Sequence, residues 1–309
     1  MAVVWMILIV VGLALAVFAS RRAVTHASAL SFGLRIPPFL IGITLVAIGT
    51  DLPEIANSIA ASISGNGDLN IGDSVGSAAT QITLILGIAP LAGGAFTAGG
   101  RRVVWVGALT AVALGIGAFL FSDGYLGRRD AVILLAFWLA ANLIVWRVRS
   151  PGSEPVMAVP TRGKAQHLAA ALTYLALVGI GATTAVLAFA QVSAVLGVPQ
   201  YIIAFFVASI GTSLPELVVS ISALRQGARD LAVGDLFGAS LSDASLSIAA
   251  GPLIAPTAIT GALAVRGSIV ALVAVAVVTI LVALTRRIDW KAGLILLVLY
   301  AGFYAAFLV

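Results

Sequence analysis

Two short segments of the chain carry nearly the same acidic motif. Residues 49–54 read Gly-Thr-Asp-Leu-Pro-Glu, and residues 211–216 read Gly-Thr-Ser-Leu-Pro-Glu. The match continues without a gap to residues 81 and 243 at a constant offset of 162, and 14 of the 33 aligned pairs are identical. Unrelated apolar segments would share Ala, Leu and Val, whereas these two share Glu and Asp. The chain therefore contains an internal duplication centred on Glu54 and Glu216.

Several carboxylates lie inside stretches that are otherwise apolar. No Lys or Arg lies deep in these stretches, so no side chain of opposite charge is available to pair with the acids. An ionised carboxylate at the centre of a bilayer costs about 2.5 to 3.5 kcal/mol even on insertion scales. We therefore expect a bound cation or a proton to supply the missing positive charge. The acids concerned are Asp51, Glu54, Asp73, Glu216, Asp235 and Asp243.

The prolines of the two motifs indicate where backbone oxygens become available. Pro53 and Pro215 have no amide hydrogen, so the carbonyls of Gly49 and Gly211, four residues earlier, lose their helical donors. Carboxylate, carbonyl and hydroxyl oxygens are the ligands that hard cations such as Na⁺ and Ca²⁺ prefer. The sequence therefore predicts an oxygen-lined cation site. The nearby hydroxyl groups are those of Thr50, Thr212, Ser213 and Ser77.

The composition places these motifs in a membrane. Of the 309 residues, 61% are hydrophobic and only 9% are charged, and the mean hydropathy is +1.15. An ordinary soluble domain carries about 25% charged residues. We therefore expect an all-α polytopic membrane protein and exclude a soluble enzyme. Ten apolar runs approach the length of a transmembrane helix, at residues 2–19, 37–64, 70–95, 103–121, 129–147, 167–190, 198–224, 231–255, 267–285 and 290–309. The second and seventh runs are long and are interrupted by Gly, Thr and Pro, so we expect tilted or broken helices there.

Basic residues are distributed unevenly between the ten runs. The odd-numbered connections hold 14 of the 17 Lys and Arg residues, and the even-numbered connections hold only Arg128, Arg129 and Arg266. The positive-inside rule then places the odd connections in the cytoplasm and both termini on the extracytoplasmic side of the cell membrane. The net charge of +5 thus reflects topology and predicts no nucleic-acid partner. The partners that we expect are inorganic cations and the lipid bilayer.

The longest polar connection divides the chain into two halves. We expect a first five-helix repeat at residues 1–147, a cytoplasmic linker at 148–166 and a second five-helix repeat at 167–309. Five spans, an odd number, separate equivalent points, so the two repeats must cross the membrane in opposite senses. Inverted-topology repeats of this kind are typical of transporters that give alternating access to a site near the midplane.

These motifs resemble those of the calcium/cation antiporter superfamily, and most closely those of its prokaryotic sodium/calcium exchanger branch. The resemblance rests on the two acidic motifs together with Gly-Asp-Ser-Val-Gly-Ser at residues 72–77 and Gly-Asp-Leu-Phe-Gly-Ala at residues 234–239. It implies a secondary active antiporter that exchanges Na⁺ for Ca²⁺, with no enzymatic activity and no cofactor. It also implies that Glu54 and Glu216 are the central ligands, which bind Ca²⁺ and share Na⁺. The further ligands implied are Thr50, Thr212, Ser213, Ser77, Asp243 and the backbone carbonyls near Ala47 and Ser209.

Several positions depart from the pattern of that family. Asp51 stands in place of the usual Ser, Asp73 and Asp235 stand in place of Asn after the Gly, and Gln81 stands where Asn or Asp is common. We include Asp51 and Gln81 among the expected ligands. The added carboxylates could raise the positive charge that is bound, or they could titrate and couple transport to protons.

Three functions are compatible with these residues. Exchange of Na⁺ for Ca²⁺ is favoured by the duplicated motif, and proton-coupled exchange of Ca²⁺, Na⁺ or another cation is favoured by the added aspartates. The third is an intramembrane hydrolase that uses an acid pair such as Asp51 and Glu54. The duplication argues against the hydrolase, since an enzyme needs no twofold cation path, and the sequence offers no Cys and only two His residues for a catalytic set.

Overall fold

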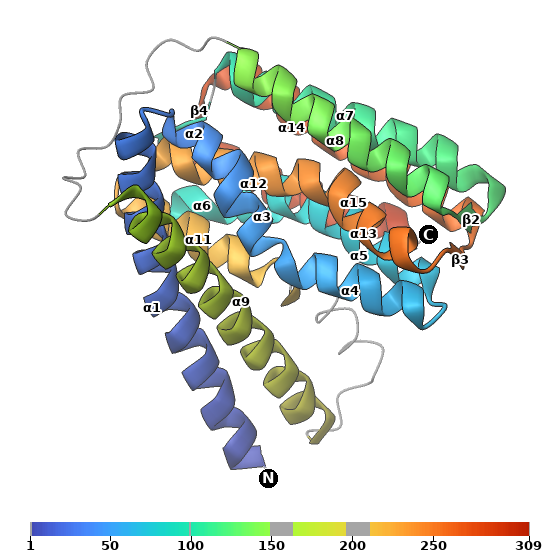
Figure 1. The fold of residues 1–309 in the computed structure, drawn as a ribbon, viewed down its shortest axis with the longest axis horizontal. Helices are drawn as coiled ribbons and strands as arrows, with labels where there is room; N and C mark the ends of the chain where they lie inside the picture. The colour runs from blue at the N-terminus through green and yellow to red at the C-terminus, as the bar shows by residue number, and fades with distance from the viewer. Residues whose placement is uncertain (1, 99, 149–162, 196–210, 309) are drawn as a thin grey trace.

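The computed structural model is built almost wholly from helices (Figure 1). The predicted linker at 148–166 falls largely outside the residues that the structure describes, and so does the start of the seventh predicted span, residues 198–210. The described residues are 2–98, 100–148, 163–195 and 211–308.

The first half of the chain contains helices of very different lengths. The shortest of them, together with π-helical turns, follow one another around the first acidic motif. The elements are α1 (Ala2–Leu34), α2 (Pro38–Ile41), π-helical η1 (Gly42–Val46), α3 (Ala47–Thr50), α4 (Leu52–Ile63), α5 (Gly67–Thr80), π-helical η2 (Gln81–Ile85), α6 (Leu86–Gly93), β1 (Phe96–Thr97), α7 (Arg101–Leu120), the 3-10 turn η3 (Phe121–Asp123), β2 (Tyr125–Leu126) and α8 (Arg128–Arg147).

The second half repeats this order. Several of its elements begin 162 residues after their counterparts, which is the offset of the sequence duplication: α11 follows α4, α12 follows α5, and η5 follows η2 in this way. The structural repeat is therefore in register with the sequence repeat. The elements are α9 (Lys164–Val195), α11 (Leu214–Arg225), α12 (Arg229–Ser242), π-helical η5 (Asp243–Ser247), α13 (Ile248–Ile254), β3 (Thr257–Ala258), α14 (Gly261–Thr285), β4 (Arg287–Ile288) and α15 (Trp290–Leu308).

Two short antiparallel ribbons join the halves. Strand β1 pairs with β4, and β2 pairs with β3, so that each ribbon takes one strand from each half. Each strand has only two residues, which is too short for an alternating pattern of polar and apolar residues to predict it from the sequence. The ribbons connect the loops at the ends of α6, α7, α13 and α14.

The long helices α1 and α9 form a pair that projects from the rest of the molecule, whereas α7, α8 and α14 lie together on the opposite side (Figure 1). The helices α4, α5, α11 and α12 lie between these groups. The backbones of α1 and α9 come close at Gly12 and Gly181, where a Cβ atom on either glycine would overlap the backbone of the other helix. Small residues at such a crossing are typical of helix packing in membranes.

The break expected in the second apolar run is confirmed. The helices Pro38–Thr50 and Leu52–Ile63 meet at Asp51 with a bend of 45°. Pro53 lies in the first turn of α4, where its missing amide hydrogen leaves no helical bond unmade. In the second half, Ser213 takes the equivalent place before α11. The first acidic motif therefore ends one helix and begins the next.

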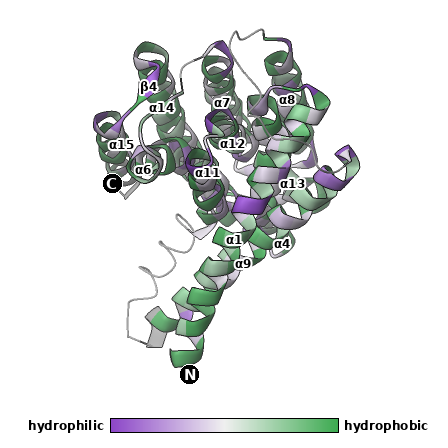
Figure 2. Cartoon of the chain, turned by 90° about the vertical axis from the view of Figure 1, so that its left-hand side faces the viewer, coloured by the Kyte–Doolittle hydropathy of each residue, from purple (hydrophilic) through white to green (hydrophobic). Residues whose placement is uncertain are grey.

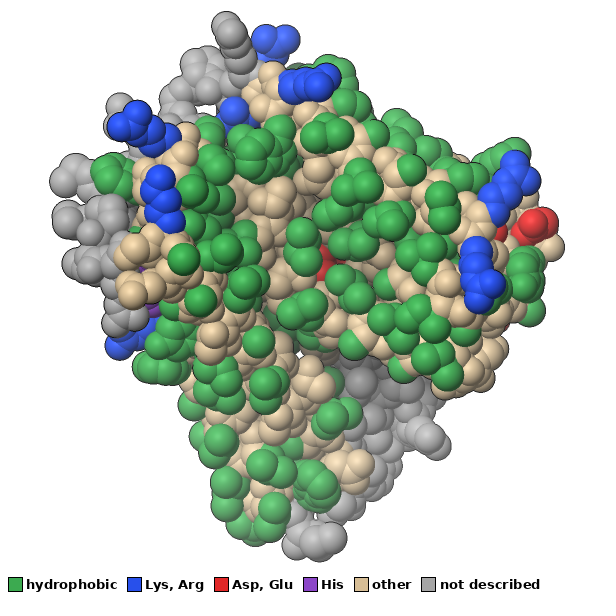
Figure 3. Space-filling view, viewed as in Figure 1, with side chains coloured by type: hydrophobic (Ala, Val, Ile, Leu, Met, Phe, Trp, Pro, Cys, Tyr) green, Lys and Arg blue, Asp and Glu red, His purple; other side chains and the backbone are tan. Residues whose placement is uncertain are grey.

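The surface is that of a protein that crosses a membrane. Lys and Arg side chains gather at two opposite edges of the face in Figure 3, with hydrophobic side chains between them. Most helical residues in Figure 2 have the colour of hydrophobic residues. Among the described residues, six helices are long and apolar enough to span a bilayer, and the bent pair at Asp51 is a seventh candidate.

Several expected span boundaries differ from the structure, among them the start of the ninth span, which was expected at residue 267 although α14 begins at Gly261. The first span was expected to end at residue 19, but α1 continues to Leu34, so Arg21 and Arg22 lie on a helix and not in a loop. The sixth span was expected to begin at residue 167, but α9 begins at Lys164. A helix can extend beyond the apolar run or tilt within the bilayer, so hydropathy does not fix its end.

Candidate functional site

The two motif glutamates lie at equivalent positions in the first turns of α4 and α11. Glu54 is the third residue of α4, Glu216 is the third residue of α11, and neither side chain is exposed. The amino-terminal turn of a helix carries a partial positive charge, which favours a carboxylate there. The helix breaks therefore place both acids where the backbone dipole of a helix favours negative charge.

Three carboxylates come together at this place. Asp51, which precedes α4, brings an oxygen within 4.8 Å of oxygens of both Glu54 and Glu216, and all three side chains are buried. We call these three residues the carboxylate cluster. All three residues were expected from the sequence to be ligands, although Asp51 departs from the family pattern. The structure places this added acid beside the two glutamates and not at the edge of the site.

The oxygens of the carboxylate cluster have no hydrogen-bond partners among the described residues. Both carboxylate oxygens of Asp51, of Glu54 and of Glu216 are buried and unpartnered. Three buried carboxylates at this separation would repel one another strongly if all were ionised. The arrangement therefore requires positive charge from outside the protein, either a metal cation or protons, and it suits a hard cation that prefers oxygen ligands.

Gln81 and Asp243 form a second part of the site. Gln81 Nε2 donates a hydrogen bond of 2.8 Å to Asp243 Oδ2. Gln81 begins the π-helical turn η2, and Asp243 begins η5. Turns of this kind inside α-helices often occur at functional sites. The remaining oxygens, Gln81 Oε1 and Asp243 Oδ1, are buried without a hydrogen-bond partner in the described chain, so both can serve as ligands.

The other two added aspartates, Asp73 and Asp235, each accept a hydrogen bond from a threonine hydroxyl in the acidic motif of the other half. Thr212 Oγ1 donates to Asp73 Oδ1 at 3.1 Å, and Thr50 Oγ1 donates to Asp235 Oδ1 at 3.4 Å. These two contacts are related by the offset of 162. Asp73 and Asp235 therefore connect α5 and α12 to the helix break of the other half.

Sequence reasoning missed two residues that complete these contacts. Asn57 Nδ2 donates to Asp73 Oδ2 at 2.5 Å, and Ser220 Oγ donates to Asp235 Oδ2 at 2.8 Å. Both donors lie about one turn after a motif glutamate, Asn57 three residues after Glu54 and Ser220 four residues after Glu216. That spacing places donor and glutamate on the same side of the helix, and it is the signal that could have revealed them.

The remaining expected ligands take different places. Ser213 Oγ is buried without a hydrogen-bond partner in the described residues, so it is available to a cation. Ser77 Oγ lies 3.2 Å from Thr212 Oγ1. The carbonyl of Ala47 accepts hydrogen bonds from the amide of Asp51 at 2.9 Å and from Thr50 Oγ1 at 3.1 Å. Ser209 lies outside the described residues.

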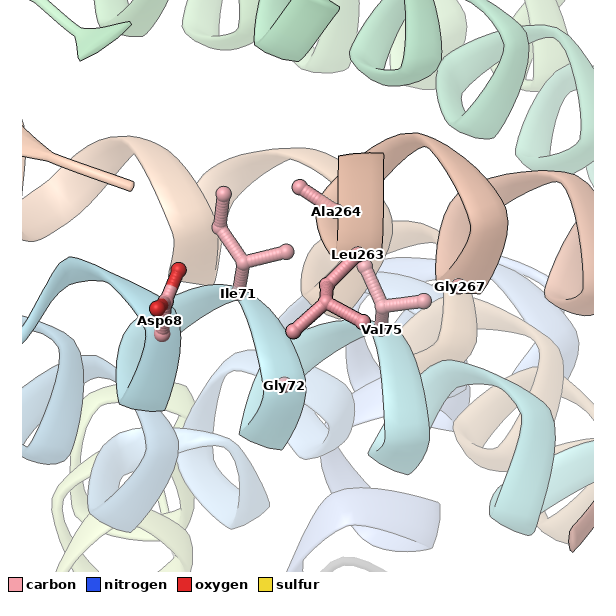
Figure 4. A pocket seen from close by; sticks show the side chains of 7 residues that line it. All are labelled: Asp68, Ile71, Gly72, Val75, Leu263, Ala264 and Gly267. Atoms are coloured by element: carbon pink, nitrogen blue, oxygen red, sulfur yellow. The ribbon is translucent and has the colours of Figure 1, made fainter. Parts of the chain in front are cut away.

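A cavity of about 110 Å³ between α5 and α14 does not belong to this site (Figure 4). Its one acid, Asp68, accepts hydrogen bonds from Thr260, at 2.5 Å from the amide and 2.7 Å from the hydroxyl. The cavity is otherwise apolar and contains none of the expected ligands. It is lined by Asp68, Ile71, Gly72, Val75, Leu263, Ala264 and Gly267.

Comparison with known proteins gives three findings that agree. The model of the family described as "Sodium/calcium exchanger protein" matches residues 4–147 and 167–309. The putative antiporter CaxA of Alkalimonas amylolytica is 30% identical over 312 residues, which cover 96% of each chain. The inner membrane protein YrbG of Escherichia coli strain K12 is 34% identical over 265 residues, covering 81% of this chain and 79% of YrbG.

More distant relatives and solved structures extend the likeness. The sodium/calcium exchanger MaX1 of Methanosarcina acetivorans is 27% identical over 293 residues, covering 82% of this chain and 84% of that protein. A structure of the sodium-calcium exchanger NCX_Mj, soaked with 10 mM Na⁺ and no Ca²⁺, superposes with a TM-score of 0.81 and 23% identity and covers 99% of each chain. At that identity, the match to the solved structure establishes a common fold.

Proposed function

The chain belongs to the sodium/calcium exchanger protein family, and on this premise we propose that it is a secondary active antiporter that exchanges Na⁺ for Ca²⁺. The observation that carries the proposal is the carboxylate cluster, in which Asp51, Glu54 and Glu216 approach one another without partners in the described chain. Ca²⁺ takes about six to eight oxygen ligands. We propose that the cluster, with Asp243, Gln81 and Ser213, supplies the side-chain part of that set.

We propose that Na⁺ and Ca²⁺ compete for the same carboxylates. A divalent cation and a group of monovalent cations can each neutralise the cluster, but both cannot occupy it together. If the site can change its access from one side of the membrane to the other only when its negative charge is compensated, an empty and ionised cluster cannot make this change. Movement of one ion then becomes coupled to movement of the other. The break at Asp51 is a natural hinge for such a change, because two helices meet there at an angle of 45° and Pro53 cannot donate a helical hydrogen bond to the carbonyl of Gly49.

We further propose that the fold consists of ten transmembrane helices in two inverted repeats, residues 1–147 and 167–309, joined by a cytoplasmic linker at 148–166. The shared offset of 162 and the two ribbons between halves support this division. The contact between Gln81 and Asp243 supports it as well, since residues at equivalent positions touch only when they lie close to an approximate twofold axis. In this proposal both termini lie on the extracytoplasmic side of the cell membrane.

Proton-coupled exchange is the alternative that a specific observation favours. Asp51 lies inside the carboxylate cluster, so its ionisation changes the charge that the cluster must bind. A proton on one of three adjacent carboxylates lowers their mutual repulsion. In this second proposal, protons replace Na⁺ as the coupling ion for Ca²⁺ or another cation.

Cation-dependent thermal unfolding in detergent tests the proposed site. A ligand that binds only the folded protein at 100 times its Kd stabilises it by about 2.7 kcal/mol. We expect Ca²⁺, and separately Na⁺, to raise the Tm of the wild-type protein, and Glu54→Gln to abolish both shifts. The control is Asp68→Asn, which changes an acid outside the site and retains an oxygen acceptor for Thr260. Equal shifts in Glu54→Gln and the wild type would contradict the proposal.

A further inference from the structure

A set of small polar side chains lies between α4, α5 and the π-helical turn η5. Ser58 and Ser62 lie one turn apart on α4, Asn70 and Ser74 lie one turn apart on α5, and Ser247 ends η5. All five are at most 3% exposed. We call these five residues the polar seam. None of them was expected as a ligand from the sequence.

Two of the five residues of the polar seam meet at one backbone carbonyl. Asn70 Nδ2 donates to the carbonyl oxygen of Ile248 at 3.2 Å, and Ser58 Oγ donates to the same oxygen at 3.5 Å. Ser58 Oγ also accepts a hydrogen bond of 3.0 Å from the amide of Gly251. These contacts place α4 and α5 against α13 at a single point, with polar atoms from all three helices.

The polar seam is continuous with the carboxylate site along the chain. Ser247 lies one turn after Asp243 in η5, and Ser74 directly follows Asp73 in α5. From this inner end the seam follows α4 and α5 outward to Ser62, the residue before the last of α4. Beyond it, Ser64 and Asn66 in the turn between α4 and α5 are exposed. Along α4 and α5, the seam residues therefore extend from the level of the buried acids toward the exposed turn between these two helices.

Four oxygens of the polar seam have no partner in the part of the chain that the structure describes. They are Ser62 Oγ, Asn70 Oδ1, Ser74 Oγ and Ser247 Oγ. Buried hydroxyl and amide groups in native proteins are nearly always hydrogen-bonded, and where protein atoms do not serve, ordered water or a bound ion does. A row of such oxygens between three helices indicates a place where water or a small cation binds.

The positions that correspond to the polar seam at the offset of 162 show that packing does not require these polar residues. At the offset of 162, the counterparts of Ser62, Asn70, Ser74 and Ser247 are Leu224, Ala232, Leu236 and Ile85, all apolar and all at most 5% exposed. Only Ser58 has a serine counterpart, Ser220, and that residue donates to Asp235. Equivalent places in the repeated framework are thus filled by hydrocarbon in one case and by unpartnered oxygens in the other.

We propose that the polar seam is a hydrated binding path for a small monovalent cation, Na⁺ or hydronium, that leads from the carboxylate site to the membrane side at which α4 ends and α5 begins. The inference rests on the proposed function. Its oxygens carry no formal charge, and high-affinity Ca²⁺ sites depend on the number of charged ligands. A neutral, oxygen-lined path therefore favours a monovalent ion and leaves Ca²⁺ to the carboxylates.

The absence of cysteine from the sequence makes the path directly testable. Ser74→Cys places a thiol in the seam, and Leu236→Cys places one at the equivalent position of the other half; the native residues are both 1% exposed. In sealed vesicles with nitrate salts, Ag⁺ is added from one side, and a thiol that it reaches releases its proton and binds the ion. Remaining free thiol is measured with a maleimide after denaturation, so that no transport activity is needed.

We expect Ag⁺ to react with the thiol of Ser74→Cys much faster than with the thiol of Leu236→Cys, so that less free thiol remains for the maleimide. We also expect this reaction to be faster when Ag⁺ is added on one side of the membrane than on the other. Slowing of that reaction by Na⁺, compared with choline at the same ionic strength, identifies Na⁺ as the ion of the path. An Ag⁺ reaction that Na⁺ leaves unchanged identifies a water-filled path for protons. Equal, slow reaction at both positions overturns the proposal, whether or not the protein transports Ca²⁺.

A second pair of variants tests the same path through transport. Asn70→Ala introduces the residue found at position 232, and Ser74→Ala removes one hydroxyl with little change in volume. We expect the half-saturating concentration of the coupling ion to rise by about fivefold to tenfold, roughly 1 to 1.4 kcal/mol, while the Ca²⁺-dependent shift in Tm is unchanged. An unchanged coupling-ion requirement, or an equal loss of Ca²⁺ binding, contradicts a separate monovalent path.

Discussion

Gln81 and Asp243 occupy the same position in the two halves of the chain, and their side chains are joined by a hydrogen bond of 2.8 Å. At this point the halves meet with different chemistry, since one contributes a neutral amide and the other a carboxylate. The asymmetry recurs at the helix breaks, where Asp51 and Ser213 are counterparts. The site thus combines a repeated framework with charges that are not repeated.

Exchange of the Gln81 and Asp243 side chains tests whether the two positions are equivalent. Gln81→Asp adds a carboxylate to the site and Asp243→Gln removes one, so each single variant changes the charge available to cations. The double variant restores both the charge and the amide–carboxylate pair. We expect it to recover more Ca²⁺ transport than either single variant, measured as initial rates in proteoliposomes. Simple addition of the two single defects would contradict direct coupling of these residues.

Neutralising one glutamate should abolish exchange and leave the protein folded. Glu54→Gln or Glu216→Gln removes one charge from the carboxylate cluster and keeps the size of the side chain. Because three close carboxylates repel one another, loss of one charge should leave the Tm without cations unchanged or higher. Size-exclusion profiles and Tm report the fold, and cation flux reports function. Normal transport by both variants would exclude these residues as ligands.

Asp51 should determine the response of transport to pH if it carries protons. Protons compete with metal cations for the carboxylates, so we expect Ca²⁺ transport by the wild type to fall as the pH falls. Asp51→Ser, which introduces the residue at the equivalent position 213, should flatten this dependence. The pH profile of initial uptake rates measures the effect. An unchanged profile in Asp51→Ser would limit Asp51 to a role as a ligand or spacer.

The threonine hydroxyls that hold Asp73 and Asp235 should contribute to stability. Thr212→Val removes the donor to Asp73, and leaving a buried acceptor with fewer partners costs about 1 to 3 kcal/mol. The matched control is Thr173→Val, because Thr173 is exposed and donates to the carbonyl of Ala169 in its own helix. Thermal unfolding in detergent measures both. Equal effects of the two substitutions would show that the contact with Asp73 has no energetic role.

The sequence predicted the helix break at the first motif more closely than it predicted the helix ends. The duplicated motif located the break at Asp51, because Pro53 and the adjacent Gly and Thr interrupt a helix by simple backbone chemistry. It did not locate the end of α1. No proline occurs between Arg21 and Ile36, and a helix can leave the bilayer without any change in its backbone.

Contacts between the halves could not be derived from one sequence. The pairing of Thr212 with Asp73 depends on the approach of two segments 139 residues apart, and no local pattern encodes it. The polar seam escaped notice for another reason. Single serines in an apolar helix are common, and Ser74 becomes informative only when its apolar counterpart Leu236 is placed in the same fold.

Uptake of ⁴⁵Ca²⁺ into proteoliposomes tests the central claim most directly. The vesicles are loaded with Na⁺ and diluted into Na⁺-free medium, in parallel with vesicles that carry only a proton gradient. Glu54→Gln serves as the inactive control, and Asp68→Asn serves as the active control. We predict uptake that requires the outward Na⁺ gradient, is absent in Glu54→Gln and is retained in Asp68→Asn. Uptake driven only by protons, or none with either gradient, would contradict Na⁺/Ca²⁺ exchange by this protein.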